Sequence, residues 1–159
     1  TIMGMPTGIK ELDNCTGGWQ NGDLIIIAGR PSMGKSATLI QFAKYPAIKH
    51  NKKVGIFSLE MTSIQIMDRM ISSESLVQYS KFSRGNVREE ELAKIHISIN
   101  SLLTDNIYVD DTPAISISVL RAKAYMMKLK HGIQMIIVDY LQLMSSERKS
   151  GGGNREQEV

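Results

Sequence analysis

The stretch Gly29-Arg30-Pro31-Ser32-Met33-Gly34-Lys35-Ser36 decides how the rest of the chain is organised. It fits the pattern G-x-x-x-x-G-K-[ST] without deviation, with an apolar run at 24–28 before it and a helix-compatible run at 37–44 after it. In such a strand–loop–helix unit, glycines let successive N–H groups point at phosphate oxygens, and the helix N-terminus adds its positive end. An ordinary Gly/Pro turn before a helix is the alternative, but both flanks favour a nucleoside-triphosphate site.

The residues expected to contact the nucleotide are the loop and the residue that follows it: Gly29, Arg30, Pro31, Ser32, Met33, Gly34, Lys35, Ser36 and Ala37. Within this set we expect Lys35 to reach the outer phosphates and the Ser36 hydroxyl to hold Mg²⁺.

Bulk composition indicates one soluble globular domain. The 159 residues are 42% hydrophobic and 22% charged, and the net charge of +3 permits nucleic-acid contact without arguing for it. A single cysteine, Cys15, excludes an intramolecular disulfide and suits a small semi-buried hydrophobe. No apolar run approaches a membrane span and the first residues lack the shape of a signal peptide, so a cytoplasmic, reducing setting is expected.

Strand and helix signals alternate along the chain. Apolar runs predict strands at 24–28, 54–59, 107–109 and 135–138, and the first of these suits a strand buried on both faces. Predicted helices lie at 34–44, ending or kinking before Pro46, from Thr62 or Ser63 onward, at 88–102, and from Ser116 or Ser118 to about His131. The alternation predicts an α/β fold with a mostly parallel sheet and helices on both faces.

Several local signals refine this pattern. Thr7 is a candidate cap for a short helix, Asn86 and Glu89 form a possible capping box, and Gly132 is a helix stop. The segment 78–85 is polar and is expected to be irregular. Trp19 is interpreted as a packing residue.

Asp139 follows the fourth apolar run and supplies the carboxylate that a phosphate loop needs for its magnesium shell. Carboxyl ends of parallel strands face one edge, so Asp139 is expected beside Ser36 if its strand and the strand before the loop are close neighbours. A strand-terminating Asp in a turn is the competing interpretation.

Glu60, at the end of the second apolar run, is the best candidate for activating the attacking water, because the residue after Asp139 is Tyr140 and not an acid. Glu60 could instead be a first-turn carboxylate of the next helix, and residue patterns alone leave both open. Asp110-Asp111 before Thr112-Pro113 indicates a turn and not a metal pair. The three histidines have no ligand or triad spacing and receive no role.

These motifs together resemble replicative DNA helicases of the DnaB type. The resemblance rests on the loop itself, on Phe57-Ser58-Leu59-Glu60-Met61, on Asp110-Asp111-Thr112-Pro113 and on the run Asp139-Tyr140-Leu141-Gln142-Leu143-Met144. It implies a RecA-like P-loop NTPase core, truncated at its C-terminus, that forms a ring hexamer around single-stranded DNA and hydrolyses ATP with Mg²⁺. It also implies a primase and a helicase loader as partners.

Carried onto this sequence, the resemblance assigns phosphate and magnesium contacts to Lys35 and Ser36, a second magnesium role to Asp139 and the catalytic base to Glu60. Arg69 matches a basic position near the subunit interface. Ser36 stands where the family more often has threonine, and both present a hydroxyl.

The chain is interpreted as a partial RecA-like domain over 1–159, with a lead-in at 1–23, a nucleotide-binding core at 24–144 and a basic, glycine-rich segment at 145–159. That last segment carries Arg148, Lys149 and Arg155, which suit contact with phosphates of single-stranded DNA without base readout. An ordinary surface loop is the alternative.

The predicted function is an ATP-dependent replicative helicase motor, active as the full-length hexamer, with the isolated fragment expected not to hydrolyse ATP measurably. A RecA-like recombinase or ring ATPase without unwinding, a nucleotide-dependent assembly module, and a small kinase with the same loop are the alternatives.

Overall fold

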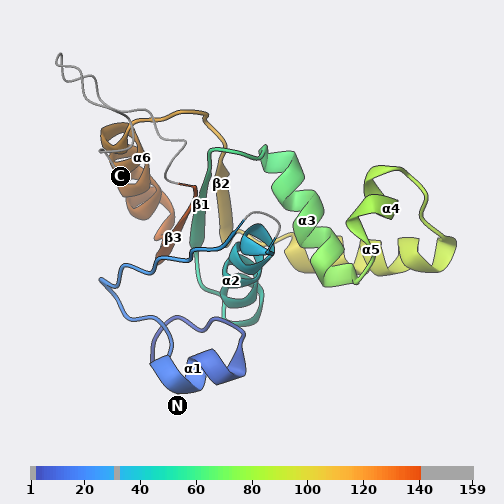
Figure 1. Cartoon of the computed structure of the whole chain (residues 1–159), viewed down its shortest axis with the longest axis horizontal. Helices are drawn as coiled ribbons and strands as arrows, with labels where there is room; N and C mark the ends of the chain where they lie inside the picture. Colours follow the sequence, from blue (N-terminus) through green and yellow to red (C-terminus); the bar gives the residue numbers. More distant parts are fainter. Residues whose placement is uncertain (1–2, 31–32, 141–159) are drawn as a thin grey trace.

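The carboxyl ends of three parallel strands meet at one edge of a small sheet (Figure 1). The computed structural model describes residues 3–30 and 33–140, and within them the strands are β1 (Val54–Ser58), β2 (Ile107–Asp110) and β3 (Met135–Asp139). Their order is β2-β1-β3, and β1 pairs in parallel with both neighbours. The α/β class with a parallel sheet, predicted from the alternation of signals, is confirmed.

Helices cover both faces of this sheet (Figure 1). Side chains of a strand point alternately to opposite faces, so Ile56 and Phe57 enter different cores. The helices of the described residues are α1 (Lys10–Thr16), α2 (Lys35–Lys49), α3 (Ser63–Ser75), α4 (Tyr79–Ser83), α5 (Glu89–Leu102) and α6 (Ile117–His131). Ile56 packs with the buried faces of α2, α3 and α5, whereas Phe57 packs with Leu120 of α6.

Most of the predicted helix ends are confirmed by their caps. The Thr62 hydroxyl accepts from the N–H of Gln65 at the start of α3, and the Ser116 hydroxyl accepts from the N–H of Val119 at the start of α6. Gly132 ends α6 at φ +71°, where a residue with a Cβ would be strained.

Two local predictions at helix starts are wrong. The helix predicted at 88–102 is capped by Glu91, whose carboxylate accepts from the N–H of Arg88, and not by Asn86 with Glu89. Near the N-terminus, Ile9 and not Thr7 precedes α1, because the Thr7 hydroxyl instead accepts from the N–H of Ile9 in a tight turn. The segment 78–85 contains the short helix α4, so its prediction as irregular is also wrong.

The lead-in segment folds against α2. Buried Asp13 accepts from the N–H of Thr7 at 2.8 Å and of Gly8 at 3.3 Å, which closes the turn before α1. The Trp19 and Phe42 rings pack edge to face with 4.6 Å between their centroids, which confirms Trp19 as a packing residue. Cys15 of α1 is exposed and not semi-buried, contrary to the sequence prediction.

Helix α2 continues through Pro46 to Lys49, although proline predicts an end or a kink there. Pro46 is fully buried, and its neighbours Phe42, Ala43 and Ala47 are buried with it. Tertiary packing of this turn therefore outweighs the hydrogen bond that proline cannot donate.

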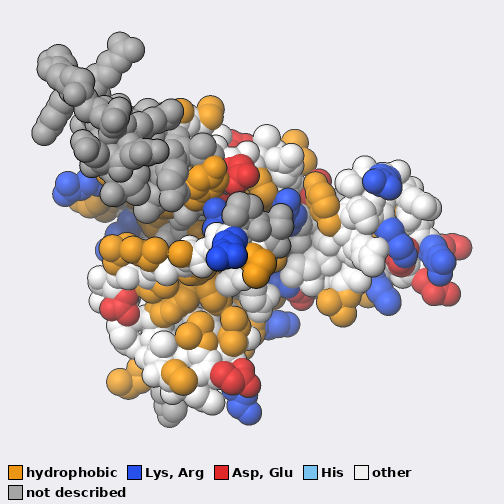
Figure 2. Space-filling model, in the orientation of Figure 1, with side chains coloured by type: hydrophobic (Ala, Val, Ile, Leu, Met, Phe, Trp, Pro, Cys, Tyr) orange, Lys and Arg blue, Asp and Glu red, His pale blue; other side chains and the backbone are white. Residues whose placement is uncertain are grey.

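The apolar run 24–28 is not a strand, contrary to the sequence prediction. Leu24 is 86% exposed and Ile26 is 75% exposed, and Figure 2 shows hydrophobic side chains at the surface along this segment. A strand requires a neighbour to satisfy its backbone groups, and none of the three described strands pairs with this run. Extended apolar sequence alone does not supply that neighbour.

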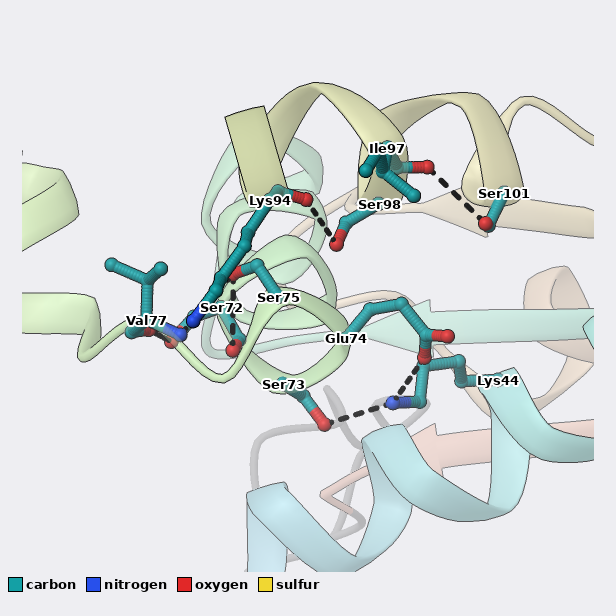
Figure 3. A network of polar contacts seen from close by, with 10 residues as sticks. All are labelled: Lys44, Ser72, Ser73, Glu74, Ser75, Val77, Lys94, Ile97, Ser98 and Ser101. Atoms are coloured by element: carbon teal, nitrogen blue, oxygen red, sulfur yellow. Dashed lines mark hydrogen bonds and ion pairs between the residues drawn. The ribbon is translucent and has the colours of Figure 1, made fainter. Parts of the chain in front are cut away.

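The buried side chain of Lys44 in α2 forms an ion pair and a hydrogen bond with residues of α3 (Figure 3). It is 7% exposed, its Nζ lies 2.8 Å from Glu74 Oε2, and it donates to Ser73 Oγ at 3.0 Å. A buried ammonium is costly without such partners, so this pair ties the helix that starts at the phosphate loop to its neighbour.

We predict that Glu74→Ala lowers the free energy of unfolding by about 2 kcal/mol, because it leaves the Lys44 ammonium with one hydroxyl acceptor. Urea unfolding of the chain followed by circular dichroism measures this change. The paired variant Lys44→Met with Glu74→Leu should recover most of the loss, since no charge then remains buried. Exposed Glu90→Ala is the matched control, and equal stability of Glu74→Ala and Glu90→Ala would contradict the prediction.

Candidate nucleotide-binding site

Gly34 turns the chain into α2 immediately before Lys35. Its φ of +86° lies in the left-handed region, which glycine adopts without steric cost. The first backbone N–H groups of α2 have no partner within the helix, so they are donors suited to an anion. Arg30 and Met33 line a hollow with Gly29 and Lys35, while Pro31 and Ser32 lie outside the described residues.

Asp139 lies beside both chemically active residues of this loop. Lys35 Nζ is 3.2 Å from Asp139 Oδ1, and Ser36 Oγ donates to Asp139 Oδ2 at 3.4 Å. Asp139 is the last residue of β3 and 5% exposed, whereas Lys35 and Ser36 open α2. The expected approach of Asp139 to Ser36, across 103 positions of sequence, is confirmed.

The oxygen atoms at this point fit a magnesium ion. Asp139 Oδ1 is buried and accepts no hydrogen bond, and the Lys35 ammonium is the charge beside it. Mg²⁺ is usually held by one or two protein oxygens together with substrate phosphates and water, and a carboxylate with a hydroxyl satisfies that requirement. Within the described residues no cluster of three acidic, histidine or cysteine side chains offers a separate metal cage.

Tyr140 is a site residue that the sequence reasoning missed. Lys35 Nζ lies 4.0 Å from the centroid of its ring, so the ammonium is held by a carboxylate on one side and an aromatic face on another. The signal available in the sequence is an aromatic residue immediately after a strand-end aspartate.

Glu60 is at the same edge of the sheet. Leu59 donates its N–H to the carbonyl of Asp139 at 2.8 Å, which places Glu60 one residue beyond a direct contact with β3. Met61 lines a small cavity together with Ser36 and Asp139, and Glu60 itself is exposed. The first turn of α3 contains no acidic residue, because Thr62 is its N-cap, so the first-turn interpretation of Glu60 is not supported.

Asp110 ends β2 and Asp111 follows it before the turn at 113–114, as the sequence predicted, and each binds a neighbouring helix. Lys123 Nζ of α6 contacts Asp110 Oδ2 at 2.6 Å, and Asp111 Oδ2 accepts from the N–H of Ser63 in α3 at 2.8 Å. Burial alone would raise the pKa of Asp110, but hydrogen bonds from Lys123 and Thr112 outweigh it and hold that pKa below its ordinary value.

The remaining residues singled out from the sequence make no contact with Asp139 in the described part of the chain, or lie outside it. His131 stacks on Tyr108 at 4.2 Å between ring centroids, which is a packing role. Arg69 lies over the Tyr79 ring at 5.5 Å. Ala37 is exposed in the first turn of α2. The proposed DNA contacts Arg148, Lys149 and Arg155 lie outside the described residues.

We predict that Asp139→Asn reduces the Mg²⁺-dependent part of nucleotide affinity by about tenfold, because it removes the carboxylate charge next to Ser36. A fluorescent ATP analogue titrated with Mg²⁺ or with EDTA measures it. Asp105→Asn, at the opposite end of β2 and exposed, is the control. An unchanged ratio between the Mg²⁺ and EDTA affinities would contradict the prediction.

Comparison with known proteins gives consistent relatives. The chain is 44% identical over 158 residues to replicative DNA helicase DnaC of Bacillus subtilis (strain 168), covering 99% of this chain and 35% of that protein. It is 43% identical over 158 residues to replicative DNA helicase DnaB of Geobacillus stearothermophilus, with the same coverage. The chain thus spans about a third of the length of these relatives.

Solved structures agree with the sequence relatives. One solved structure, described as an ATPase domain, superposes with a TM-score of 0.87 at 29% identity, covering 96% of this chain and 55% of that one. A DnaB-like replicative helicase, described with its interactions with primase, superposes with a TM-score of 0.88 at 28% identity, covering 99% of this chain and 38% of that one. The match to the family described as DnaB-like helicase C terminal domain covers residues 4–159, and the chain belongs to that family.

Proposed function

We propose that this chain is the nucleotide-binding part of an ATP-dependent replicative DNA helicase, which couples ATP hydrolysis to translocation on single-stranded DNA and to duplex unwinding. The observation that carries the proposal is the contact of Asp139 with both Lys35 and Ser36 in a chain of this helicase family. The relatives named replicative DNA helicases support the activity of the whole protein.

Each residue of the site has a distinct task in this proposal. The loop 29–36 and Ala37 hold the nucleotide phosphates, with Lys35 contributing positive charge and Ser36 and Asp139 holding Mg²⁺. When bound, Mg²⁺ neutralises charge on the transferred phosphoryl group. Glu60 accepts a proton from the attacking water in this proposal, because it is exposed and follows Leu59, whose N–H donates to the carbonyl of Asp139 at this edge.

The proposed partners are single-stranded DNA, further copies of the protein in a ring hexamer, a primase and a helicase loader. One structural neighbour is described with primase, which supports that partner for this chain. Arg69 is proposed near the subunit interface. The division into a lead-in at 1–23, a core at 24–144 and a basic segment at 145–159 is part of the same proposal, as is a place in the cytoplasm beside the DNA. No described helix has both the length and the apolar content needed to cross a membrane.

We predict that Glu60→Gln in the full-length protein lowers kcat for ATP hydrolysis by at least about 100-fold while ATP binding is retained, because the amide cannot accept the proton. Steady-state ATPase assays and nucleotide binding separate the two effects. Glu90→Gln, an exposed change in α5, is the control. If ATP turnover survives Glu60→Gln, Glu60 is not the catalytic base. If the unmodified full-length protein shows no ATP turnover, the alternative of an assembly module without hydrolysis is favoured instead.

We predict that Arg148→Ala with Lys149→Ala in the full-length protein weakens single-stranded DNA binding and flattens its dependence on salt, because fewer counterions are released. Fluorescence anisotropy with a labelled oligonucleotide at several salt concentrations measures both. Lys52→Ala with Lys53→Ala, beside the amino end of β1, removes the same charge elsewhere. An unchanged affinity and an unchanged salt slope would contradict a DNA role for this segment.

A further inference from the structure

Ser58, the last residue of β1, binds the turn that carries Glu60. The Ser58 hydroxyl donates to the carbonyl of Met61 at 2.7 Å and accepts from its N–H at 3.1 Å. Ser58 is 1% exposed, so water does not compete for these two bonds. The backbone on the amino-terminal side of α3 is therefore pinned to the end of β1, with Glu60 inside the pinned turn.

The other side of the same turn is held by a residue far away in sequence. Asp111 Oδ2 accepts from the N–H of Ser63 at 2.8 Å, across 48 positions. The bond to the Ser63 backbone lowers the pKa of Asp111, so its carboxylate is ionised near neutral pH and accepts strongly. Asp111 belongs to the turn after β2, the strand beside β1.

Helix α3 does not need Asp111 in order to be capped. The Thr62 hydroxyl accepts from the N–H of Gln65 at 3.3 Å, and Gln65 Oε1 accepts from the N–H of Thr62 at 3.0 Å. This reciprocal pair is a complete capping box from local residues. The Asp111 bond adds a different constraint, because it sets where the start of α3 lies relative to β2.

Asp111 is itself presented by a well-anchored turn. Lys123 Nζ reaches Asp110 Oδ2 at 2.6 Å and donates to Thr112 Oγ1 at 2.7 Å, and the N–H of Thr112 donates to Asp110 Oδ1 at 3.0 Å. The turn is therefore fastened to α6. Because this turn is held in place, the Asp111 carboxylate fixes the position of the Ser63 N–H that it binds.

We propose that Asp111 is a positioning residue for ATP hydrolysis, which holds the start of α3 so that the turn carrying Glu60 keeps its place at the nucleotide edge of the sheet. This inference rests on the proposed role of Glu60. In this proposal Asp111 contacts neither the nucleotide nor the attacking water, and it acts through the turn 59–62. Small displacements of a catalytic group cost rate more than they cost substrate binding.

In the full-length protein, Asp111→Ala is expected to lower kcat for ATP hydrolysis about tenfold, with KM for ATP changed less than about twofold. Asp111→Asn keeps an oxygen that accepts from Ser63, so it should restore most of the rate. Asp105→Ala, exposed at the opposite end of β2, controls for loss of an acidic surface charge. Thermal melting checks that each variant is folded.

Combination with Glu60→Gln tests whether Asp111 acts through Glu60. If it does, the double variant hydrolyses ATP in single-turnover experiments no more slowly than Glu60→Gln alone. A further tenfold loss in the double variant would show that Asp111 acts independently and would overturn the inference. A wild-type kcat in Asp111→Ala, a loss confined to KM, or no rescue by Asp111→Asn would also overturn it.

The two proposals fail in distinguishable ways. If Glu60→Gln alone keeps normal turnover, the proposed catalytic base is wrong, and the positioning role falls with it. If Glu60→Gln is inactive while Asp111→Ala turns over normally, Glu60 stands and only the role of Asp111 is lost.

Discussion

Parallel pairing of β1 with β2 on one side and β3 on the other is the constraint from which the site follows. Parallel strands bring all their carboxyl ends to one edge, and here those ends are Ser58, Asp110 and Asp139. Antiparallel pairing of β3 would place Asp139 at the far edge, away from the start of α2. The nucleotide site, the Glu60 turn and the Asp111 turn therefore share one edge for a topological reason.

This topology explains why so much of the site could be predicted. A phosphate loop is a local pattern, because glycine positions and a following helix act over a few residues. Asp139 is distant in sequence, but an aspartate that ends an apolar strand has its place set by the parallel sheet. The alternation of strand and helix signals supplies the parallel direction, which puts Asp139 at the same edge as the loop, but that β3 lies close enough for its contact with Ser36 is known only from the structure.

The parts that escaped prediction depend on contacts that no local pattern encodes. The run 24–28 has strand composition but no partner among the described strands. Pro46 remains helical because its turn is buried, and burial is a property of the assembled core. The bond from Ser63 to Asp111 joins two turns 48 positions apart, and either turn alone reads as an ordinary cap or strand end. Sequence patterns predict which elements form better than they predict which elements touch.

Charge balance connects the buried site to its proposed ligand. Asp139 is 5% exposed, and the Lys35 ammonium at 3.2 Å is the positive group that lies beside its carboxyl group. In the proposed function the phosphates of ATP attract Lys35, which would leave that carboxylate without its partner. Asp139 and Ser36, which are oriented toward each other, would hold Mg²⁺ at these oxygen atoms, and the ion would supply the positive charge that Lys35 no longer provides. In the proposed function, this arrangement would favour nucleotide that arrives with magnesium over nucleotide alone.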